Sequence, residues 1–216
     1  MSTFLGLINF IPTNAGGAFS DGYVLLNVGK EKHAATRRCC WSLFRVQALD
    51  TRSVRPRDIP PVLFDCGDVD NINDIFVLAT ALNQYKYLLD RQEMDKARAL
   101  SQVLCSNLHD IFKTQKMSCY CDLLFHEIIG KCRQEEIDRL YTEKLKDYIK
   151  LARSDISVQR IIYAYARLVL KDAAQAKACL DLFHKSCACS IWFGTVICEQ
   201  ELIALVDTVA NERESD

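Results

Sequence analysis

The stretch INDIFVLATALNQYKYLLD, residues 72–90, decides the fold. Its apolar side chains recur every three to four residues, which places them on one face of an α-helix. They include Ile72, Phe76, Leu82, Tyr85 and Leu89. No long segment that alternates apolar and polar residues competes with this pattern, so the body of the chain is predicted to be all-α.

Prolines and glycines divide the chain into two parts. All four prolines lie at or before residue 61, and only two of the eight glycines follow residue 67. The residue before a proline is pushed out of the helical region, so TRSVRPRDIPPVLFDCGDVD (51–70) marks a boundary. We therefore predict an irregular, partly apolar first domain over residues 1–66 and a helical-repeat domain over residues 67–216.

Further helices are predicted from the same spacing. In the first domain they cover roughly residues 20–31 and 34–48. In the second they follow the 72–90 helix over about 93–113, 117–130, 134–151, 156–171, 173–186 and 196–211. Almost the whole second domain is thus expected to be a row of helices joined by short turns.

Three turn regions of this row repeat at a spacing of about 40 residues. They are LLDRQEMDKARAL (88–100), IIGKCRQEEIDRL (128–140) and RLVLKDAAQAKAC (167–179). Aligned, they bring Ala97, Ile137 and Ala176 into register. A helical hairpin cannot bury its apolar face alone, so the repeat predicts stacked hairpins with one shared core. The usual function of such a stack is to hold a peptide or partner helix on its concave face.

The repeat type stays open at this point. The pattern resembles tetratricopeptide repeats, but their period is about 34 residues and most of their consensus aromatic and glycine positions are missing here. An irregular α-solenoid fits the longer period. An ordinary helical bundle with a chance period is the remaining alternative.

Composition excludes some classes of function. The formal net charge of -1 argues against nucleic-acid binding, which needs a basic surface. No stretch reaches the roughly 18 to 20 apolar residues of a membrane-spanning helix. The eleven cysteines are an odd number in a long chain, so we expect reduced thiols that mostly serve as small apolar core residues.

The stretch LINFIPTNAGGAFSDGYVLL (7–26) carries a more specific motif. Asn9 and Pro12 precede the pair Asp21-Gly22. This order resembles the second metal-site motif of the site-2 protease family of intramembrane zinc metalloproteases. The resemblance implies that Asp21 is a zinc ligand by descent, supported by the other three motif residues. By residue type alone, Asp21 is equally well a helix N-cap.

The chain lacks the other half of that zinc site. The family's His-Glu-x-x-His motif supplies two imidazole ligands and a glutamate base. The His-Glu pair of this chain, His126-Glu127, is followed by Gly130 where the second histidine should stand. We therefore expect no peptide cleavage and no zinc bound by this chain alone; zinc is implied only for a complete family member.

The resemblance implies a catalytically incomplete C-terminal region of a membrane protease, at the cytoplasmic face of a membrane. Its helical repeats would regulate the protease or recruit a substrate or partner protein, and a membrane-embedded protease half is a further expected partner. The alternative is a free-standing helical-repeat scaffold for protein–protein interaction.

Two cysteine–histidine groups offer a third, weaker hypothesis of metal binding or redox sensing. They are Cys119, Cys121 and His126, and His184, Cys187 and Cys189. Together they supply six soft ligands, but a Cys-x-Cys pair points its thiols to different sides of a helix. Core packing explains these cysteines better than a metal site does.

Overall fold

The computed structural model describes residues 48–64 and 72–215, with short pieces at residues 11, 14–15, 18–19, 22–23 and 26. In these pieces β1 (Asn14–Ala15) and β2 (Ala18–Phe19) form an antiparallel pair. The helix predicted over residues 20–31 is described only at residues 22, 23 and 26, which are helical. The helix predicted over residues 34–48 lies outside the described residues except for its last residue.

Eight α-helices make up most of residues 72–215. They are α4 (Ile75–Asp90), α5 (Met94–Asn107), α6 (Lys113–Ile129), α7 (Gln134–Leu140), α8 (Glu143–Leu151), α9 (Ile156–Ala164), α10 (Ala173–Cys189) and α11 (Phe193–Ser215). A 3-10 segment, η6 (Asp110–Phe112), precedes α6, and a π-helical segment, η7 (Tyr165–Leu170), continues α9. The all-α prediction is confirmed for this part of the chain.

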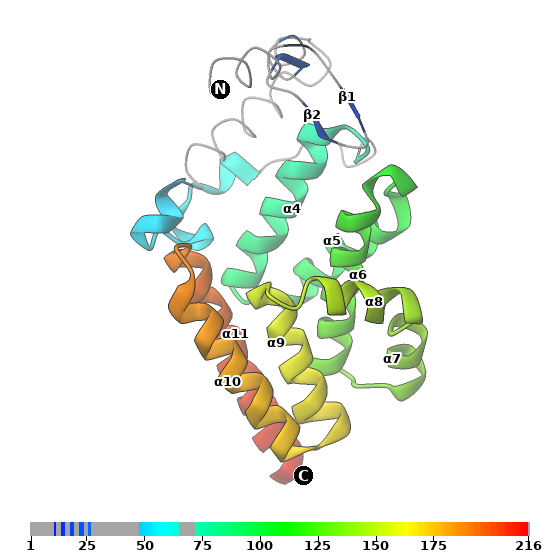
Figure 1. The fold of residues 1–216 in the computed structure, drawn as a ribbon, viewed down its shortest axis with the longest axis vertical. Helices are drawn as coiled ribbons and strands as arrows, with labels where there is room; N and C mark the ends of the chain where they lie inside the picture. Colours follow the sequence, from blue (N-terminus) through cyan, green and yellow to red (C-terminus); the bar gives the residue numbers. More distant parts are fainter. Residues whose placement is uncertain are drawn as a thin grey trace.

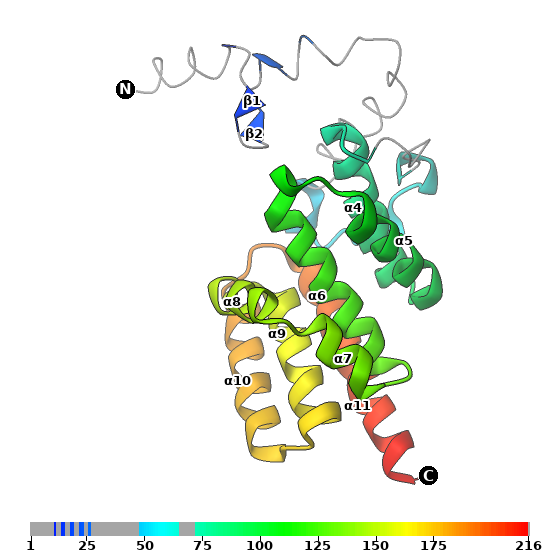
Figure 2. The same ribbon diagram turned by 90° about the vertical axis from the view of Figure 1, so that its right-hand side faces the viewer.

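Neighbouring helices pack as hairpins around a shared core. Helix α4 packs on α5 and α5 on α6, while α9 contacts α6, α10 and α11. Figures 1 and 2 show α9, α10 and α11 running side by side, with α4 and α5 above them. One cluster of buried apolar side chains extends from Ile72 to Ala210. The core predicted for stacked hairpins is therefore present.

The three aligned turns share one backbone feature. Gln92, Cys132 and Lys171 occupy the same column of the sequence alignment, and each has a positive φ, of 57°, 51° and 53° respectively. The aligned residues five positions later are all buried; they are Ala97, Ile137 and Ala176. The 40-residue spacing thus corresponds to three hairpins whose turns share a left-handed residue, although their hydrogen bonds differ. The likeness to tetratricopeptide repeats stays a prediction.

The first of these turns shows why a left-handed residue is needed. The Gln92 N–H donates to the Leu89 carbonyl and the Glu93 N–H to the Leu88 carbonyl, both at 2.9 Å. This Schellman arrangement satisfies carbonyls that have no partner inside the helix, and it requires positive φ at the residue after the C-cap. Glycine adopts that conformation most easily, but none of the three turns has glycine in this column.

Lys171→Gly is expected to stabilise the protein. At φ 53° a side chain strains the folded state by about 1–2 kcal/mol, and glycine removes this strain. Glycine also makes the unfolded chain more flexible, which favours unfolding by about 0.4–1 kcal/mol. The free energy of unfolding should therefore rise by about 0.5–1 kcal/mol. Lys177→Gly is the matched control, because Lys177 is also exposed but lies inside α10. It should lose about 1 kcal/mol. Urea unfolding of both variants measures the difference, and a loss of stability in both would contradict the prediction.

The single helix predicted over residues 134–151 is wrong, because the chain breaks between α7 and α8. Thr142 has an extended backbone with ψ 162°, and its hydroxyl accepts a hydrogen bond from the Leu145 N–H at 3.4 Å. Threonine is a favourable N-cap, so it starts a new helix here. Residues at this break, Leu140, Thr142 and Lys144 among them, line a hollow that is described below.

The helix predicted to reach residue 113 ends at Asn107 instead. The Asn73 side chain holds this end: its Nδ2 donates to the Asn107 carbonyl at 2.9 Å, and its Oδ1 accepts from the His109 N–H at 2.8 Å. Asn73 lies just before α4, so the cap comes from the turn that leads into the neighbouring helix. Local spacing could not indicate it.

Residues 48–64 lie against the helical array, and we call them the docking segment. It contains three 3-10 turns: η2 (Ala48–Arg52), η3 (Pro56–Asp58) and η4 (Pro61–Phe64). The first contacts α11 and the other two contact α4 (Figure 1). These contacts cross the predicted domain boundary at residue 66, and the division into two domains stays a prediction.

Candidate functional site

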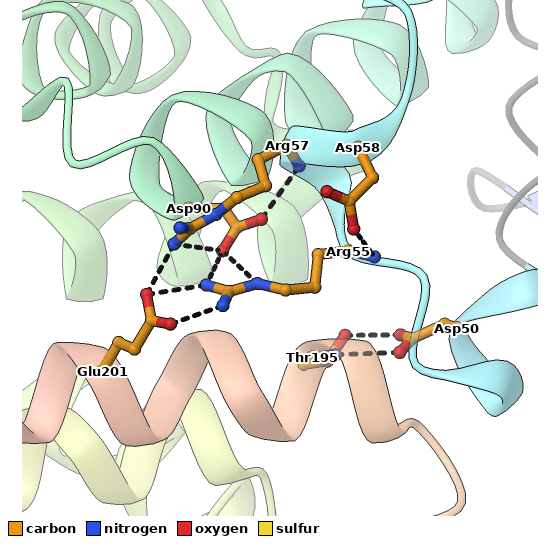
Figure 3. Close-up of polar contacts among 7 residues, drawn as sticks. All are labelled: Asp50, Arg55, Arg57, Asp58, Asp90, Thr195 and Glu201. Carbon is orange, nitrogen blue, oxygen red and sulfur yellow. Dashed lines mark hydrogen bonds and ion pairs between the residues drawn. The ribbon is translucent and has the colours of Figure 1, made fainter.

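Four charged side chains join the docking segment to the helices, and we call Arg55, Arg57, Asp90 and Glu201 the arginine junction (Figure 3). The Arg55 guanidinium donates to Asp90 at the end of α4 and to Glu201 in α11, with its Nη2 2.8 Å from Glu201 Oε2. Arg57 donates its backbone N–H to Asp90 Oδ2 at 2.8 Å. Its Nη2 reaches both carboxylates, so each arginine spans α4 and α11.

The buried carboxylate of this junction requires cationic partners. The Asp90 side chain is fully buried and that of Arg55 is only 12% exposed, while Glu201 is 38% exposed. A hydrogen bond from Arg55 is the largest cause that lowers the pKa of Glu201 to about 2. The same bond, followed by that to Asp90, raises the pKa of Arg55. A buried carboxylate is tolerated only when it is paired, so the site needs positive charge from the docking segment.

The sequence Arg-Pro-Arg-Asp presents both arginines by its local geometry. Pro56 begins η3, and the Arg55 N–H donates to Asp58 Oδ2 at 3.0 Å, which closes a short turn. Arg55 itself is extended, with φ -94° and ψ 156°, as expected for the residue before a proline. The turn therefore directs two neighbouring arginines toward one pair of carboxylates.

A second anchor lies at the start of α11. The Thr195 N–H and hydroxyl donate to the Asp50 carboxylate at 2.8 and 2.6 Å, so the docking segment caps this helix (Figure 3). Beside it the backbone of Val54 approaches Gly194 very closely: a Cβ on Gly194 would lie 2.3 Å from the Val54 carbonyl oxygen. Only glycine leaves room for the segment here.

A buried ionic centre links four helices inside the array. Arg160 in α9 is fully buried, and its Nη1 lies 3.1 Å from both carboxylate oxygens of Glu199 in α11. Its Nη2 is 3.5 Å from Asp122 Oδ1 in α6, and the guanidinium stacks over the Phe125 ring at 4.2 Å. Tyr85 in α4 completes the centre, and its hydroxyl is hydrogen-bonded to His126 of α6.

Burial shifts the pKa values of this centre. It raises the pKa of Asp122 to about 7, against the opposing effect of Arg160, and it also raises that of Glu199. Burial and then the charge of Arg160 lower the pKa of His126 to about 3, so this imidazole is neutral. Its Nε2 lies 3.2 Å from the Tyr85 hydroxyl. The centre has the composition of an acid–base site, but Arg160, Glu199 and His126 are buried between the helices, and only the Asp122 side chain is partly exposed.

The third candidate is a hollow between α6, α7 and α8, which we call the basic hollow. Its volume is about 550 Å³. Its lining combines apolar side chains with basic ones and a single acidic one; the residues are Asp110, Lys113, Lys116, Met117, Tyr120, Arg139, Leu140, Thr142, Lys144 and Leu145. Because Leu140 and Leu145 are buried while Lys113, Arg139 and Lys144 are exposed, the hollow has an apolar floor and a basic rim.

The predicted protease motif falls almost entirely on residues that the structure does not describe. Asn9, Pro12 and Asp21 lie outside the described residues, and Gly22 is helical and buried. The role of Asp21 as a zinc ligand and the support from the other three residues therefore stay predictions. In the described part of the chain, no helix combines the length and the apolar character needed to cross a membrane.

The His-Glu pair of the sequence is part of the core. His126 faces Tyr85, whereas the buried Glu127 carboxylate accepts hydrogen bonds from Arg98 and Arg133 at 2.8 and 2.9 Å. Hydrogen bonding to Arg133 lowers the pKa of Glu127 to about 2. The two side chains therefore serve separate contacts and do not form one site.

The cysteine–histidine groups are not brought together. Cys119 and Cys121 are buried in α6, whereas in α10 Cys187 is buried and Cys189 exposed. Among residues 48–64 and 72–215, no three His, Cys, Asp or Glu side chains cluster closely enough to hold a metal ion. Most cysteines of this part of the chain are free and buried, which confirms their predicted role in core packing.

Sequence reasoning missed the charged residues that matter most in the structure. The proline pattern indicates SVRPRD (53–58) only as part of the domain boundary, although its two arginines dock on the array. The sequence did contain a sign that Arg160 and Glu199 are buried, because each charge stands among apolar residues of a helix. Arg160 lies in VQRIIYA (158–164) and Glu199 in VICEQELIALV (196–206). Long charged side chains are almost never fully buried unless they are paired.

In the part of the chain that the structure describes, these features define the class of protein by its fold: an all-α array of packed hairpins on which a segment of short 3-10 turns from the same chain is docked. Comparison with protein-family models, curated proteins and solved structures finds no match to the chain.

Proposed function

We propose that the helical array is a polypeptide-binding scaffold whose resident ligand is the docking segment of its own chain. The observation that carries this proposal is the arginine junction, in which α4 and α11 hold two side chains of the docking segment. The segment has short 3-10 turns and no long helix or strand of its own among residues 48–64. It is thus held in the way a helical array holds a peptide.

The docked segment combines the three kinds of contact that make peptide binding specific. The arginines supply charge, and Asp50 supplies a helix cap on Thr195. Phe64 supplies an apolar anchor, because its ring stacks on Tyr87 with centroids 4.6 Å apart. Charged pairs fix the register of such contacts, while buried rings contribute most of the affinity.

A peptide offered in trans tests this proposal. A fluorescent peptide of residues 48–64 is titrated against the full chain and against its Arg55→Ala/Arg57→Ala variant, with fluorescence anisotropy as the readout. The native segment competes at a high effective concentration, so the variant should bind the peptide at least about tenfold more tightly than the unchanged chain. High salt should weaken the binding because both arginines form ion pairs with Asp90 and with Glu201.

Two controls sharpen the experiment. A peptide carrying the same two alanines should bind much more weakly than the native peptide. Glu201→Gln in the double variant should weaken binding of the native peptide, and because Glu201 is 38% exposed the substitution should leave the core intact. If the double variant keeps its helical circular dichroism and cooperative unfolding but binds no native peptide, the proposal is wrong.

The membrane-protease hypothesis remains a second proposal, supported by the order of Asn9, Pro12, Asp21 and Gly22. In that case the docked segment would hold the protease part against the array, for regulation or for recruitment of a partner. Reading the DNA upstream for an in-frame His-Glu-x-x-His between apolar helices tests it. Absence of such an element there and in neighbouring genes favours the free-standing scaffold.

A further inference from the structure

We propose that the basic hollow is a second binding site, which takes an acidic segment of a partner protein that also carries apolar side chains. The hollow is independent of the arginine junction. It lies on α6, α7 and α8, whereas the docking segment contacts α4 and α11, and Figure 1 shows these parts on opposite sides of the array. Both sites can therefore be occupied at once.

The rim of the hollow has an excess of positive charge. Its four basic side chains face one carboxylate, that of Asp110. Lys116 lies 3.5 Å from Asp110, and Arg139 is paired with Glu136. Lys113 and Lys144 have no ion-pair partner within residues 48–64 and 72–215. These two exposed ammonium groups can accept carboxylates from a ligand without breaking an existing contact.

The floor of the hollow decides between a protein and a nucleic-acid ligand. Met117 and Tyr120 are half-buried beside the buried Leu140 and Leu145, so the floor offers apolar surface. A methionine there adapts to ligand side chains of different shapes. Nucleic acids are held mainly by rows of phosphate contacts on a basic face, whereas this chain has a net charge of -1. An acidic peptide with leucine or phenylalanine fits both the rim and the floor.

The volume of about 550 Å³ lies within the range of ligand pockets, roughly 300–1,000 Å³, which is enough for a few side chains. The break between α7 and α8 is what opens this space. Thr142 lies at the break and also lines the hollow, so the cap that separates the two helices shapes the site.

Charge reversal on the rim tests the proposal in the full chain. The probe is a fluorescein-labelled peptide in which glutamates flank one leucine and one phenylalanine, and anisotropy measures its binding. Lys113→Glu/Lys144→Glu should weaken binding by at least about tenfold, because two attractive pairs become repulsive. Both lysines are exposed, so the variant should keep its fold.

A matched variant separates site binding from general attraction. Lys177→Glu/Lys185→Glu makes the same change of net charge on exposed positions of α10 and should leave the affinity unchanged. Equal weakening by both variants overturns the proposal, as does absence of binding to the unchanged chain. A labelled single-stranded oligonucleotide that binds more tightly than the peptide and loses affinity in the rim variant would assign the hollow to nucleic acid instead. None of these outcomes depends on the docking segment.

Discussion

Replacing Arg160 with methionine is expected to lower the free energy of unfolding by about 3–5 kcal/mol. The guanidinium is fully buried and pairs with Glu199 and Asp122 on two other helices. Its removal leaves two carboxylates without a cation in a poorly solvated interior. Methionine keeps most of the side-chain volume, so the loss reports the charge more than a cavity. Urea unfolding followed by circular dichroism measures it.

The loss should depend on pH. In the folded protein burial raises the pKa of Asp122 to about 7, above its usual value of about 3.9. Since the folded state then holds a proton that the unfolded chain has released, stability falls as pH rises from about 4 to about 7. Without Arg160, which opposes this shift, the pKa of Asp122 rises further and the window extends upward. The variant should therefore lose more stability at pH 8 than at pH 5.

Two companion variants test this explanation. The double variant Arg160→Met/Glu199→Leu also removes the buried Glu199 carboxylate that loses its cation in the single variant. At least about half of the lost stability should therefore return. Arg167→Met serves as the surface control, because Arg167 pairs with the exposed Glu214 and should contribute about 0–1 kcal/mol. A loss in Arg160→Met that is equal at both pH values and unchanged in the double variant would show that packing, and not charge, is responsible.

Gly194→Ala should cost about 1–3 kcal/mol and release the docking segment from α11. The new Cβ would lie 2.3 Å from the Val54 carbonyl oxygen and 2.7 Å from Asp50 Oδ1, so the backbone of the segment has to move. That movement breaks the cap on Thr195. Amide hydrogen exchange is the specific readout: the Thr195 N–H should lose protection, while amides in α6 should not.

Whether Gly194→Ala lowers or raises the free energy of unfolding tests the close approach of Val54. Helix propensity alone predicts that alanine in place of glycine stabilises α11 by up to about 1 kcal/mol. Ala204→Gly, at an exposed position of the same helix, calibrates that contribution and should lose about the same amount. If Gly194→Ala is more stable than the unchanged chain, the close approach of Val54 does not form in solution.

The fold of residues 72–215 could be predicted well because its signals are local. Apolar side chains at helical spacing indicate helices wherever one face is buried. The 40-residue repeat correctly indicated three hairpins, and the structure adds that Gln92, Cys132 and Lys171 share a left-handed backbone. The break at Thr142 had a local signal too, since threonine favours N-caps, but the apolar pattern continued across it. The prediction followed the pattern and missed the cap.

The candidate sites were much less predictable. The basic hollow needs α6, α7 and α8 to meet at defined angles, and helix spacing does not contain those angles. Asp21 was singled out by a family resemblance, and its surroundings lie outside the described residues. The arginines of SVRPRD carried no sign of their partners, because Arg55 is 35 residues from Asp90 and 146 from Glu201.

The sequence by itself determined that this chain builds helical hairpins with a common core, since helix formation and turn geometry depend on neighbours within a few residues. Only the tertiary structure decided which charges are buried together, as in the pairing of Arg160 with Glu199, 39 residues further along. The energy of a buried ion pair depends on the distance and solvation of groups far apart in the chain. Those quantities exist only after the helices have packed.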